Sequence, residues 1–393
     1  MHLPFLTLAV VLAVAGGTPP QKNQIPNLKP ALKEQKGLAY VDASTRMNYI
    51  GHATLWQPVD LDQIDARAGR QIFHSNGSNK ILPNDSTVEC RYVQEAVGGT
   101  TDKFHCDFIQ ATDSRNKPIK IQLKKLKVRY HSVKTVSDVI VTRLAWILGF
   151  GSEIETPVLK VICHGCSPDP FHQKAPVVHG EQTFARASVE TSLSDGDGIY
   201  VEGTRYPKDA HKNESAWYWD ELRYISNPER KAQSDALKLF AVFLKHGDSK
   251  AIQNNLICRT DLDAEGFCAD PFLYVKDFGN TLGSDGMSVH PLDLKKWSTA
   301  PVWKDSKRCI GSLHMNLGNG SGLSDPEISE AGRKFLAGLL SNLIQHESKL
   351  RDIFDAAHIQ EYDDHGHRYS VDDWVRVFEA RAALIINHPP CPK

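Results

Sequence analysis

Residues 243–258, FLKHGDSKAIQNNLIC, place chemically active side chains at the boundary between two apolar segments. They are one histidine, one aspartate, one lysine and two asparagines: His246, Asp248, Lys250, Asn254 and Asn255. Carboxylate and amide oxygens hold divalent cations, a lysine neutralises phosphate, and a second carboxylate can orient a hydroxyl for phosphoryl transfer. The alternative is a polar turn in which His246 caps its helix and Asp248 closes an Asx turn.

A second candidate metal ligand lies downstream. The segment VKDFG, residues 275–279, ends an apolar, strand-like run and presents Asp277. A match to DFG alone is weak, because three residues recur by chance in many proteins. Its place after HGDSK, with the strand-like segments NLIC and PFLYV between them, is more specific, since both the residues and the elements must agree.

A hairpin with a glycine-containing turn precedes these segments. Residues 86–95 and 104–111 alternate like two strands. The turn between them carries Gly98, Gly99, Thr100 and Thr101. Backbone amides of such a turn can approach phosphate closely because glycine has no Cβ. An ordinary hairpin loop has the same composition.

Next come a basic strand and an amphipathic helix. Three cations compete for a position that neutralises phosphates: Lys120, Lys127 and Arg129. A solvated strand edge would carry lysines as well. The segment SDVIVTRLAWILGFG has helical spacing, with Ser137 as a possible N-cap and Gly149 as the stop. Asp138 falls in its first turn, where the helix dipole favours a carboxylate in any case.

The rest of the chain predicts further helices and one irregular stretch. Residues 167–215 are rich in Pro, His, Gly and Asp and are interpreted as a linker or insertion. RKAQSDALKLFAVFLKH carries an apolar helical stripe, and a long helix is expected to begin near Ser324-Asp325-Pro326. The segment SVDDWVRVFEARAALI predicts a last helix.

Eight cysteines, an even number, can form disulfides in an exported chain. Cys90 and Cys106 flank the glycine turn, and the pair formed by Cys258 and Cys268 flanks a second turn, so each pair could face across a hairpin. The segment Cys163-His164-Gly165-Cys166 predicts a disulfide or free thiols. A rival hypothesis is a metal or redox protein with zinc at this segment, although a second ligand pair is absent.

The composition and the N-terminus limit the classes of partner. A formal charge of -1 excludes a global field that would gather nucleic acid. The segment MHLPFLTLAVVLAVAGG has the length of a signal-peptide core, and Ala13-Val14-Ala15 matches an A-x-A cleavage site, so we expect an exported chain cleaved near Ala15. No later stretch is long enough to span a membrane, so we expect a mature chain without such a span.

The order of these features resembles the protein-kinase-like superfamily, and HGD is closest to its aminoglycoside-phosphotransferase-like branch. A nearer resemblance is to exported bacterial proteins that share GGT, an R-L-x-W-x-L-G-F helix, C-x-G-C, H-x-D-S-K and a D-x-G strand end. The resemblance covers residues 86–285. It implies an α+β, two-lobed protein-kinase-like fold with a small antiparallel-sheet N-lobe and a mainly helical C-lobe. The chain then divides into a signal peptide (1–15), a leader and extension (16–85), an N-lobe (86–166), an insertion or linker (167–215) and a C-lobe with extra helices (216–393).

The resemblance also implies roles for these residues. Asp248 would be the catalytic aspartate, Lys250 would contact the transferring phosphate, and Asp277 would hold magnesium. Gly98 to Thr101 would cover the phosphates of ATP, and Lys127 would pair with Asp138.

The chain departs from the kinase-like pattern in three places, one of which is that Asp138 lies earlier in its helix than the usual acidic partner. The metal-binding amide belongs five residues after the aspartate, which is Gln253; we expect Asn254 or Asn255, which follow, to take this role. If Arg129 rather than Lys127 holds the strand position, nucleotide binding would be weakened or rearranged, since arginine is not a neutral replacement for lysine.

Two function hypotheses follow. The first is an exported phosphotransferase that uses ATP and magnesium on a hydroxyl acceptor, favoured by the presence of both Asp248 and Asp277. The second is a catalytically inactive, kinase-like secreted binding module braced by disulfides, favoured by the scarcity of ATP outside the cytoplasm.

Overall fold

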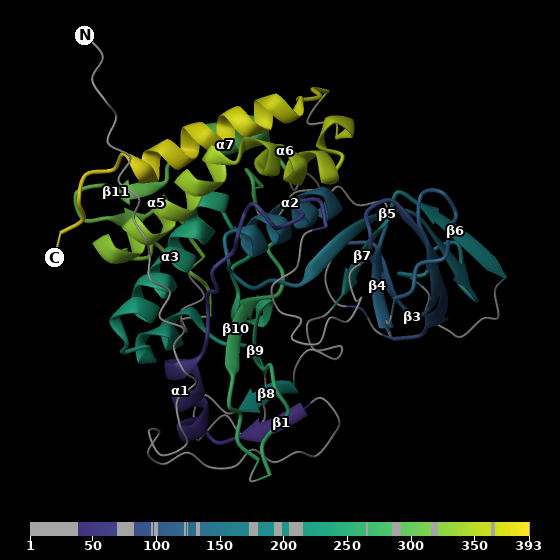
Figure 1. The fold of residues 1–393 in the computed structure, drawn as a ribbon, viewed down its shortest axis with the longest axis horizontal. Helices are drawn as coiled ribbons and strands as arrows, with labels where there is room; N and C mark the ends of the chain where they lie inside the picture. The colour runs from purple at the N-terminus through teal and green to yellow at the C-terminus, as the bar shows by residue number, and fades with distance from the viewer. Residues whose placement is uncertain are drawn as a thin grey trace.

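The fold combines a β-barrel, a four-stranded sheet and a group of helices (Figure 1). The computed structural model describes residues 38–68, 82–95, 97, 101–121, 123, 125–130, 134–172, 180–191, 199–203, 215–264, 266–284, 292–315, 321–362 and 366–392. The signal peptide predicted for residues 1–15, most of the predicted leader, and the turn residues Gly98, Gly99 and Thr100 lie outside these ranges.

Five strands close into the barrel in the order β2, β3, β4, β7, β5. Their bounds are β2 Ser86–Val93, β3 Lys103–Thr112, β4 Lys125–Arg129, β7 Ser188–Thr191 and β5 Ile154–His164. Neighbours in the ring are antiparallel except β5 and β2, which run parallel and close it. Alternate strand residues such as Val88, Phe104 and Val128 fill its interior. Strand β6, Glu181–Ala185, pairs with β5 beside β7.

The two-lobed protein-kinase-like fold expected from the sequence is wrong. The content is mixed α+β and the predicted hairpin is confirmed by β2 and β3, but the sheet does not stay a small open one. It closes because β5 pairs with β2 on one side and with β7 on the other. Strands β6 and β7 come from residues 167–215, the stretch interpreted as a linker.

A second sheet joins the N-terminal extension to the middle of the chain. Its order is β1, β8, β9, β10, with bounds β1 Leu38–Val41, β8 Ile199–Gly203, β9 Asn254–Cys258 and β10 Pro271–Val275. Helix α1, Ala43–His52, follows β1. Arg46 of α1 donates to Glu221 in the 3₁₀ helix η2, Trp219–Tyr224, at 2.8 and 2.9 Å, and both side chains are buried. Residues 38–68 therefore belong to the folded body.

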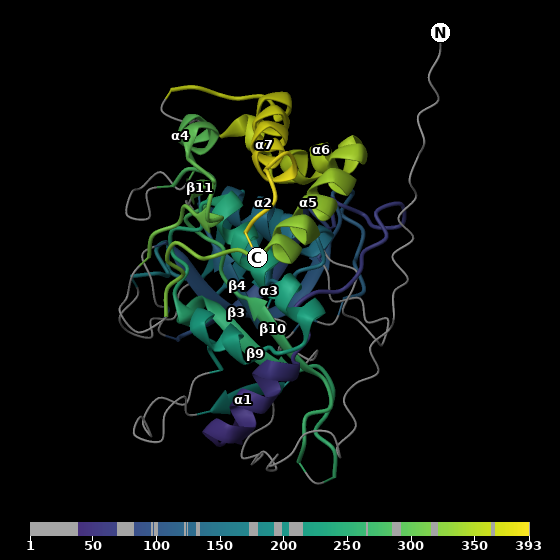
Figure 2. The ribbon, with the colours of Figure 1, turned by 90° about the vertical axis from the view of Figure 1, so that its left-hand side faces the viewer.

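Helices cover this sheet and one side of the barrel. They are α2 Lys134–Ile147, α3 Pro228–Leu244, α4 Leu294–Thr299, α5 Glu330–Gln345, α6 Glu347–Ala356 and α7 Val371–Ile386, with the short 3₁₀ helices η3 Ala251–Gln253 and η4 Ile359–Glu361 and the small hairpin β11 Trp303–Asp305 and β12 Ile310–Gly311. In Figure 2, α5, α6 and α7 lie at one end, α1 at the other, and β9 and β10 between them. One large apolar core joins α3 to α5, α6 and α7.

Helix boundaries agree with the sequence at some ends and differ at others. Helix α3 begins where Asn227 accepts from the Arg230 N–H with Pro228 in the first turn, and α7 begins at a capping box of Ser370 and Asp373. Helix α2 begins before Ser137, so this serine is an internal, buried residue and not the expected N-cap. Helix α5 begins after its N-cap Ser329, later than expected from the Ser-Asp-Pro signal.

All eight cysteines form disulfides. The pairs are Cys90–Cys106, Cys163–Cys166, Cys258–Cys268 and Cys309–Cys391. The two pairs predicted across hairpins are thereby confirmed. Among the described helices, none combines the length and apolar character needed to cross a bilayer.

Candidate functional site

The end of helix α3 fixes the HGD segment. Lys245 adopts the left-handed conformation (φ 60°, ψ 50°), and the His246 N–H donates to the Ala241 carbonyl at 2.9 Å, an ordinary αL helix ending. The His246 ring is fully buried 5.3 Å from the ring of Phe278, and the Gly247 N–H donates to the Asn280 carbonyl at 2.9 Å. The HGD and DFG turns therefore pack directly on each other.

Gln253 connects the two aspartates expected to be functional. Its side-chain Nε2 donates to Asp248 Oδ2 at 3.1 Å. Its backbone carbonyl accepts from the N–H groups of Lys276 and Asp277 at 2.6 and 3.4 Å. Lys250 Nζ lies 2.8 Å from Asp248 Oδ1. The structure thus brings Asp248, Lys250 and Asp277 into one local assembly.

Asp277 is oriented by its own turn. The Gly279 N–H donates to Asp277 Oδ1 at 2.7 Å, which is an Asx turn directly after β10. Asp248 lies in the turn after α3, and both aspartates are followed by irregular backbone rather than by helix or strand. Polar side chains on turns fixed by rigid elements are the usual carriers of binding and catalysis.

A buried cluster of charged groups lies between the barrel and α2. Arg129 on β4 is 3.2 Å from Asp138 Oδ2 on α2 and 3.5 Å from Glu155 Oε2 on β5. It also pairs with Glu190 on β7, and Lys127 pairs with the same Glu190. Asp138 therefore pairs with Arg129, whereas the expected partner Lys127 is engaged with Glu190.

Burial and neighbouring charges shift the pKa values of the carboxyl groups in this cluster in opposite directions. Burial raises the pKa of Glu155 to about 8, although Arg129 acts in the opposite direction. Burial, followed by the charge of Glu190, raises the pKa of Glu153 well above its ordinary range. Burial also acts to raise the pKa of Glu190, but Lys127 and Arg129 outweigh it and hold that pKa well below its ordinary range. Opposite shifts in adjacent carboxyl groups are common at functional sites.

A small cavity joins the cluster to the DFG turn. Arg129, Glu155, Lys276 and Asp277 are among the residues that line it. Its volume is about 10 Å³, enough for about one water molecule or a small cation. Burial acts to lower the pKa of Arg129, but Glu155, Glu190, Asp138 and Asp277 together raise it well above its ordinary value, so Asp277 belongs to the same electrostatic unit.

The sequence matches no protein-family model, and a search of curated proteins finds no match.

The two asparagines face different surroundings. Asn255 Nδ2 donates to the Tyr274 hydroxyl at 3.0 Å, and that hydroxyl donates to Glu153 at 3.3 Å. Asn255 Oδ1 accepts from Ser215 at 3.0 Å. Asn254 Nδ2 donates to the Trp217 carbonyl at 3.0 Å, while its buried Oδ1 accepts no hydrogen bond within the described part of the chain. Among the described residues, Asn254 is therefore the asparagine whose side-chain oxygen accepts no hydrogen bond.

Of the four turn residues expected to cover phosphates, the structure describes Thr101. The hydroxyl of Thr101 accepts from Lys103 Nζ at 3.3 Å. Lys103 on β3 lies directly opposite Arg129 on β4 in the strand register. The described end of this turn thus lies beside the strand position of Arg129.

Three carboxylates of the charged cluster were missed from the sequence: Glu153, Glu155 and Glu190. Glu153, directly before β5, and Glu155, inside it, could have been noticed because acids lie at alternate positions where an apolar strand begins and a buried face should be apolar. Glu190 carried no such signal, because it lies in the stretch interpreted as a linker.

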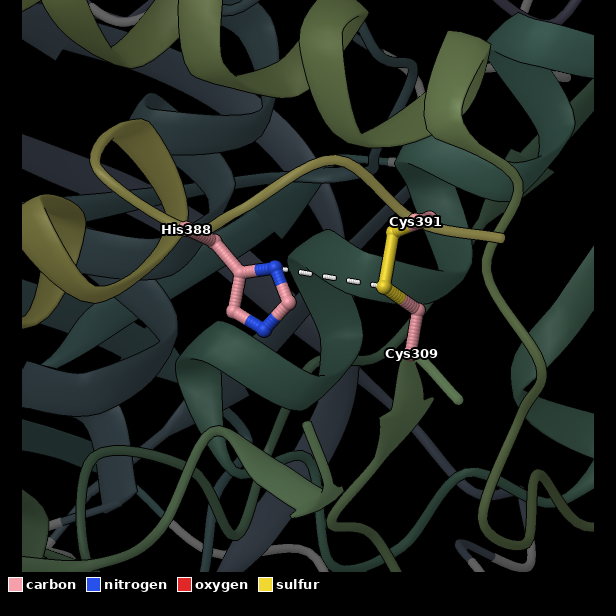
Figure 3. Close-up of side chains that lie close together, drawn as sticks. All are labelled: Cys309, His388 and Cys391. Carbon is pink, nitrogen blue, oxygen red and sulfur yellow. Dashed lines mark hydrogen bonds between the residues drawn. A yellow bond between two sulfur atoms is a disulfide. The ribbon is translucent and has the colours of Figure 1, made fainter. Parts of the chain in front are cut away.

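Two cysteine–histidine groups do not offer metal ligands. Cys309 and Cys391 form a disulfide, with His388 Nδ1 3.9 Å from Cys309 Sγ and 2.7 Å from the Pro389 carbonyl (Figure 3). Cys163 and Cys166 are likewise bonded to each other. Zinc binds thiolates, and both pairs are oxidised.

Proposed function

We propose that the chain is an exported phosphotransferase that transfers the terminal phosphoryl group of ATP to a hydroxyl acceptor with Mg²⁺. The observation that carries the proposal is the Gln253 bridge, which holds Asp248 through its side chain and the Asp277 turn through its carbonyl. Phosphoryl transfer needs a carboxylate beside the acceptor and another beside the phosphates, in fixed relation.

Asp248, with Lys250, would act at the acceptor. Asp248 would accept the proton of the hydroxyl as its oxygen bonds to the terminal phosphorus. The bond from that phosphorus to the bridging oxygen breaks at the same time, and ADP leaves with the electron pair. The side chain of Lys250 is 42% exposed beside Asp248, so it can reach a phosphate oxygen while it stays near the carboxylate.

Asp277 and Asn254 offer oxygen atoms of the kind that a hard cation binds. Mg²⁺ prefers oxygen ligands, and Asp277 supplies a carboxylate. Asn254 supplies a buried carbonyl oxygen that accepts no hydrogen bond among the described residues, a state that costs about 1–3 kcal/mol unless a ligand offsets it. Asp277 and Asn254 would hold Mg²⁺, which when bound neutralises the phosphate charge. Asn255 would instead align Tyr274 beside Glu153.

Export is supported by the cysteines. All eight are in disulfides, which persist in oxidising compartments and are rare in the cytosol.

A catalytically inactive, disulfide-braced binding module is the second candidate. It is favoured by the size of the cavity between Arg129 and Asp277, which at about 10 Å³ admits a water molecule but not a phosphate group. A phosphotransferase would have to separate the barrel from the DFG turn when ATP enters, whereas a binding module would not.

Isothermal titration calorimetry with ATP separates the two candidates. Wild type should bind ATP more tightly with Mg²⁺ than without it, and Asp277→Asn should lose this difference. Asp261→Asn, a matched change at an exposed aspartate outside the site, should retain it. If ATP gives no heat with or without Mg²⁺, the phosphotransferase is excluded and the binding module stands.

A further inference from the structure

A larger cavity lies between the barrel and the helices, apart from the charged cluster. Its volume is about 510 Å³, within the usual range for small-molecule sites. It is bounded by the β6–β7 corner and β5 on the barrel side and by α2 and the α6–η4 segment on the other. It involves neither Asp248 nor Asp277.

Most of the cavity wall is apolar. Val136 and Val139 of α2 face it from one side, and Val158, Ala185 and Ala187 of the barrel face it from the other. Leu159, which also lines it, is 52% exposed, an unusual exposure for a large aliphatic side chain. An apolar ligand body would remove this surface from water.

One ion pair and one histidine–carboxylate hydrogen bond cross from the barrel side to the helical side at the cavity. Arg186 at the β6–β7 corner pairs with Glu361 of η4, and Asp85 before β2 accepts from His358 Nε2 at 2.7 Å. The four side chains are between 38% and 77% exposed. Pairs this exposed contribute about 0–1 kcal/mol each, so a ligand can replace them at little cost.

The donors at the cavity favour a carboxylate over a cation. Arg186 uses only Nη1 to bond Glu361, and its Nε and Nη2 make no hydrogen bond within the described part of the chain. A guanidinium is suited to bind a carboxylate through two nitrogens. Of the acids at the cavity, Glu361 pairs with Arg186, and Asp85 is hydrogen-bonded to His358.

We propose that this cavity binds an anionic amphiphile, with an apolar body between α2 and the barrel and a carboxylate on Arg186. This site is separate from the proposed phosphotransferase site.

Titration of the full chain with three ligands of equal chain length tests the proposal. Decanoate, decanol and decyltrimethylammonium would each be used below the concentration at which they form micelles. Decanoate should bind most tightly, and Arg186→Gln should weaken it about 10-fold, whereas Arg186→Lys should weaken it less. Equal affinity for all three ligands, tighter binding of the cation, or no binding of decanoate would overturn the proposal.

A pair of bulky substitutions locates the bound ligand. Ala185 is exposed and lines the cavity, so Ala185→Phe should fill the cavity without disturbing the fold and should abolish decanoate binding. Ile109→Phe, at an exposed apolar position on β3, is the matched control and should leave binding unchanged. Unchanged binding in Ala185→Phe would place the ligand elsewhere and overturn the assignment.

Discussion

Arg129 and Asp138 form a buried ion pair, 3.2 Å between Nη1 and Oδ2, that links the β-barrel to helix α2. Only 3% and 5% of the two side chains are exposed. Arg129 also faces Glu155 and Glu190, so one guanidinium contacts acidic groups on three other elements. Its position depends on barrel closure, because β7 supplies Glu190 and β5 supplies Glu155.

Removing this guanidinium should destabilise the fold. We expect Arg129→Met to lower the free energy of unfolding by about 3–5 kcal/mol, because it leaves buried carboxylates without their cation. Urea denaturation would measure the change. Lys127→Met is the comparison: Glu190 keeps Arg129 as a partner there, so the loss should be clearly smaller. Equal losses in the two variants would contradict the central role of Arg129.

Stability should fall as pH rises from about 5 to 8. The pKa of Glu155 is raised to about 8 in the folded chain, so the native state holds a proton that the unfolded state has released in this range. The pKa of Glu190 is lowered, so its contribution is lost only at acid pH and does not oppose the slope here. One such proton lowers the free energy of unfolding by at most about 1.4 kcal/mol for each pH unit.

Glu155→Gln provides the control for this pH dependence. Glutamine has nearly the same shape and does not ionise, so the slope of unfolding free energy against pH should decrease by about one proton. Glu153, whose pKa is also raised, should leave some slope in this variant. An unchanged slope would show that Glu155 does not hold the proton.

Local patterns in the sequence predict many of the elements but not their closure. The helix α3 and the strands β2, β3, β9 and β10 follow from apolar periodicity and turn residues. The barrel does not, because its strand β7, like the neighbouring β6, lies in a stretch whose Pro, His and Gly content is typical of loops. The parallel pairing of β5 with β2 is a long-range contact that leaves no local signal.

The candidate site likewise has residues that the sequence predicts and contacts that it does not. Asp248, Lys250 and Asp277 could be predicted because short motifs carry them. The pairing of Arg129 with Asp138 could not be predicted. Lys127 and Arg129 lie two residues apart on the same face of β4, and the sequence does not say which of them contacts Asp138. Asn254 was distinguished from Asn255 only by the hydrogen bonds that each amide makes in the fold.

The disulfide Cys309–Cys391 should contribute more stability than Cys258–Cys268. The first closes a loop with a sequence separation of 82 and ties the C-terminus to β12, whereas the second closes one of 10. Chain entropy gives about 4–5 kcal/mol for the long loop and about 3 kcal/mol for the short one. Denaturation of the two double Cys→Ala variants would compare them, and the reverse order would contradict the prediction.

Gln253 should position Asp248 without holding the nucleotide. Gln253→Leu removes the donor to Asp248 but keeps the backbone carbonyl that fixes the Asp277 turn. We expect kcat to fall about 100-fold while Kd for Mg-ATP stays the same, because a displaced catalytic group affects turnover more than binding. A parallel loss of binding would indicate that Gln253 supports the fold or the metal instead.

Transfer of labelled terminal phosphate from ATP, to water and to serine-, sugar- and lipid-hydroxyl acceptors, tests the proposed function most directly. We expect wild type and Asp261→Asn to transfer the label. Asp248→Asn should transfer it about 100- to 10,000-fold more slowly while it still binds Mg-ATP. Equal transfer by wild type and Asp248→Asn, or no transfer by wild type to any acceptor, would contradict a phosphotransferase built on Asp248.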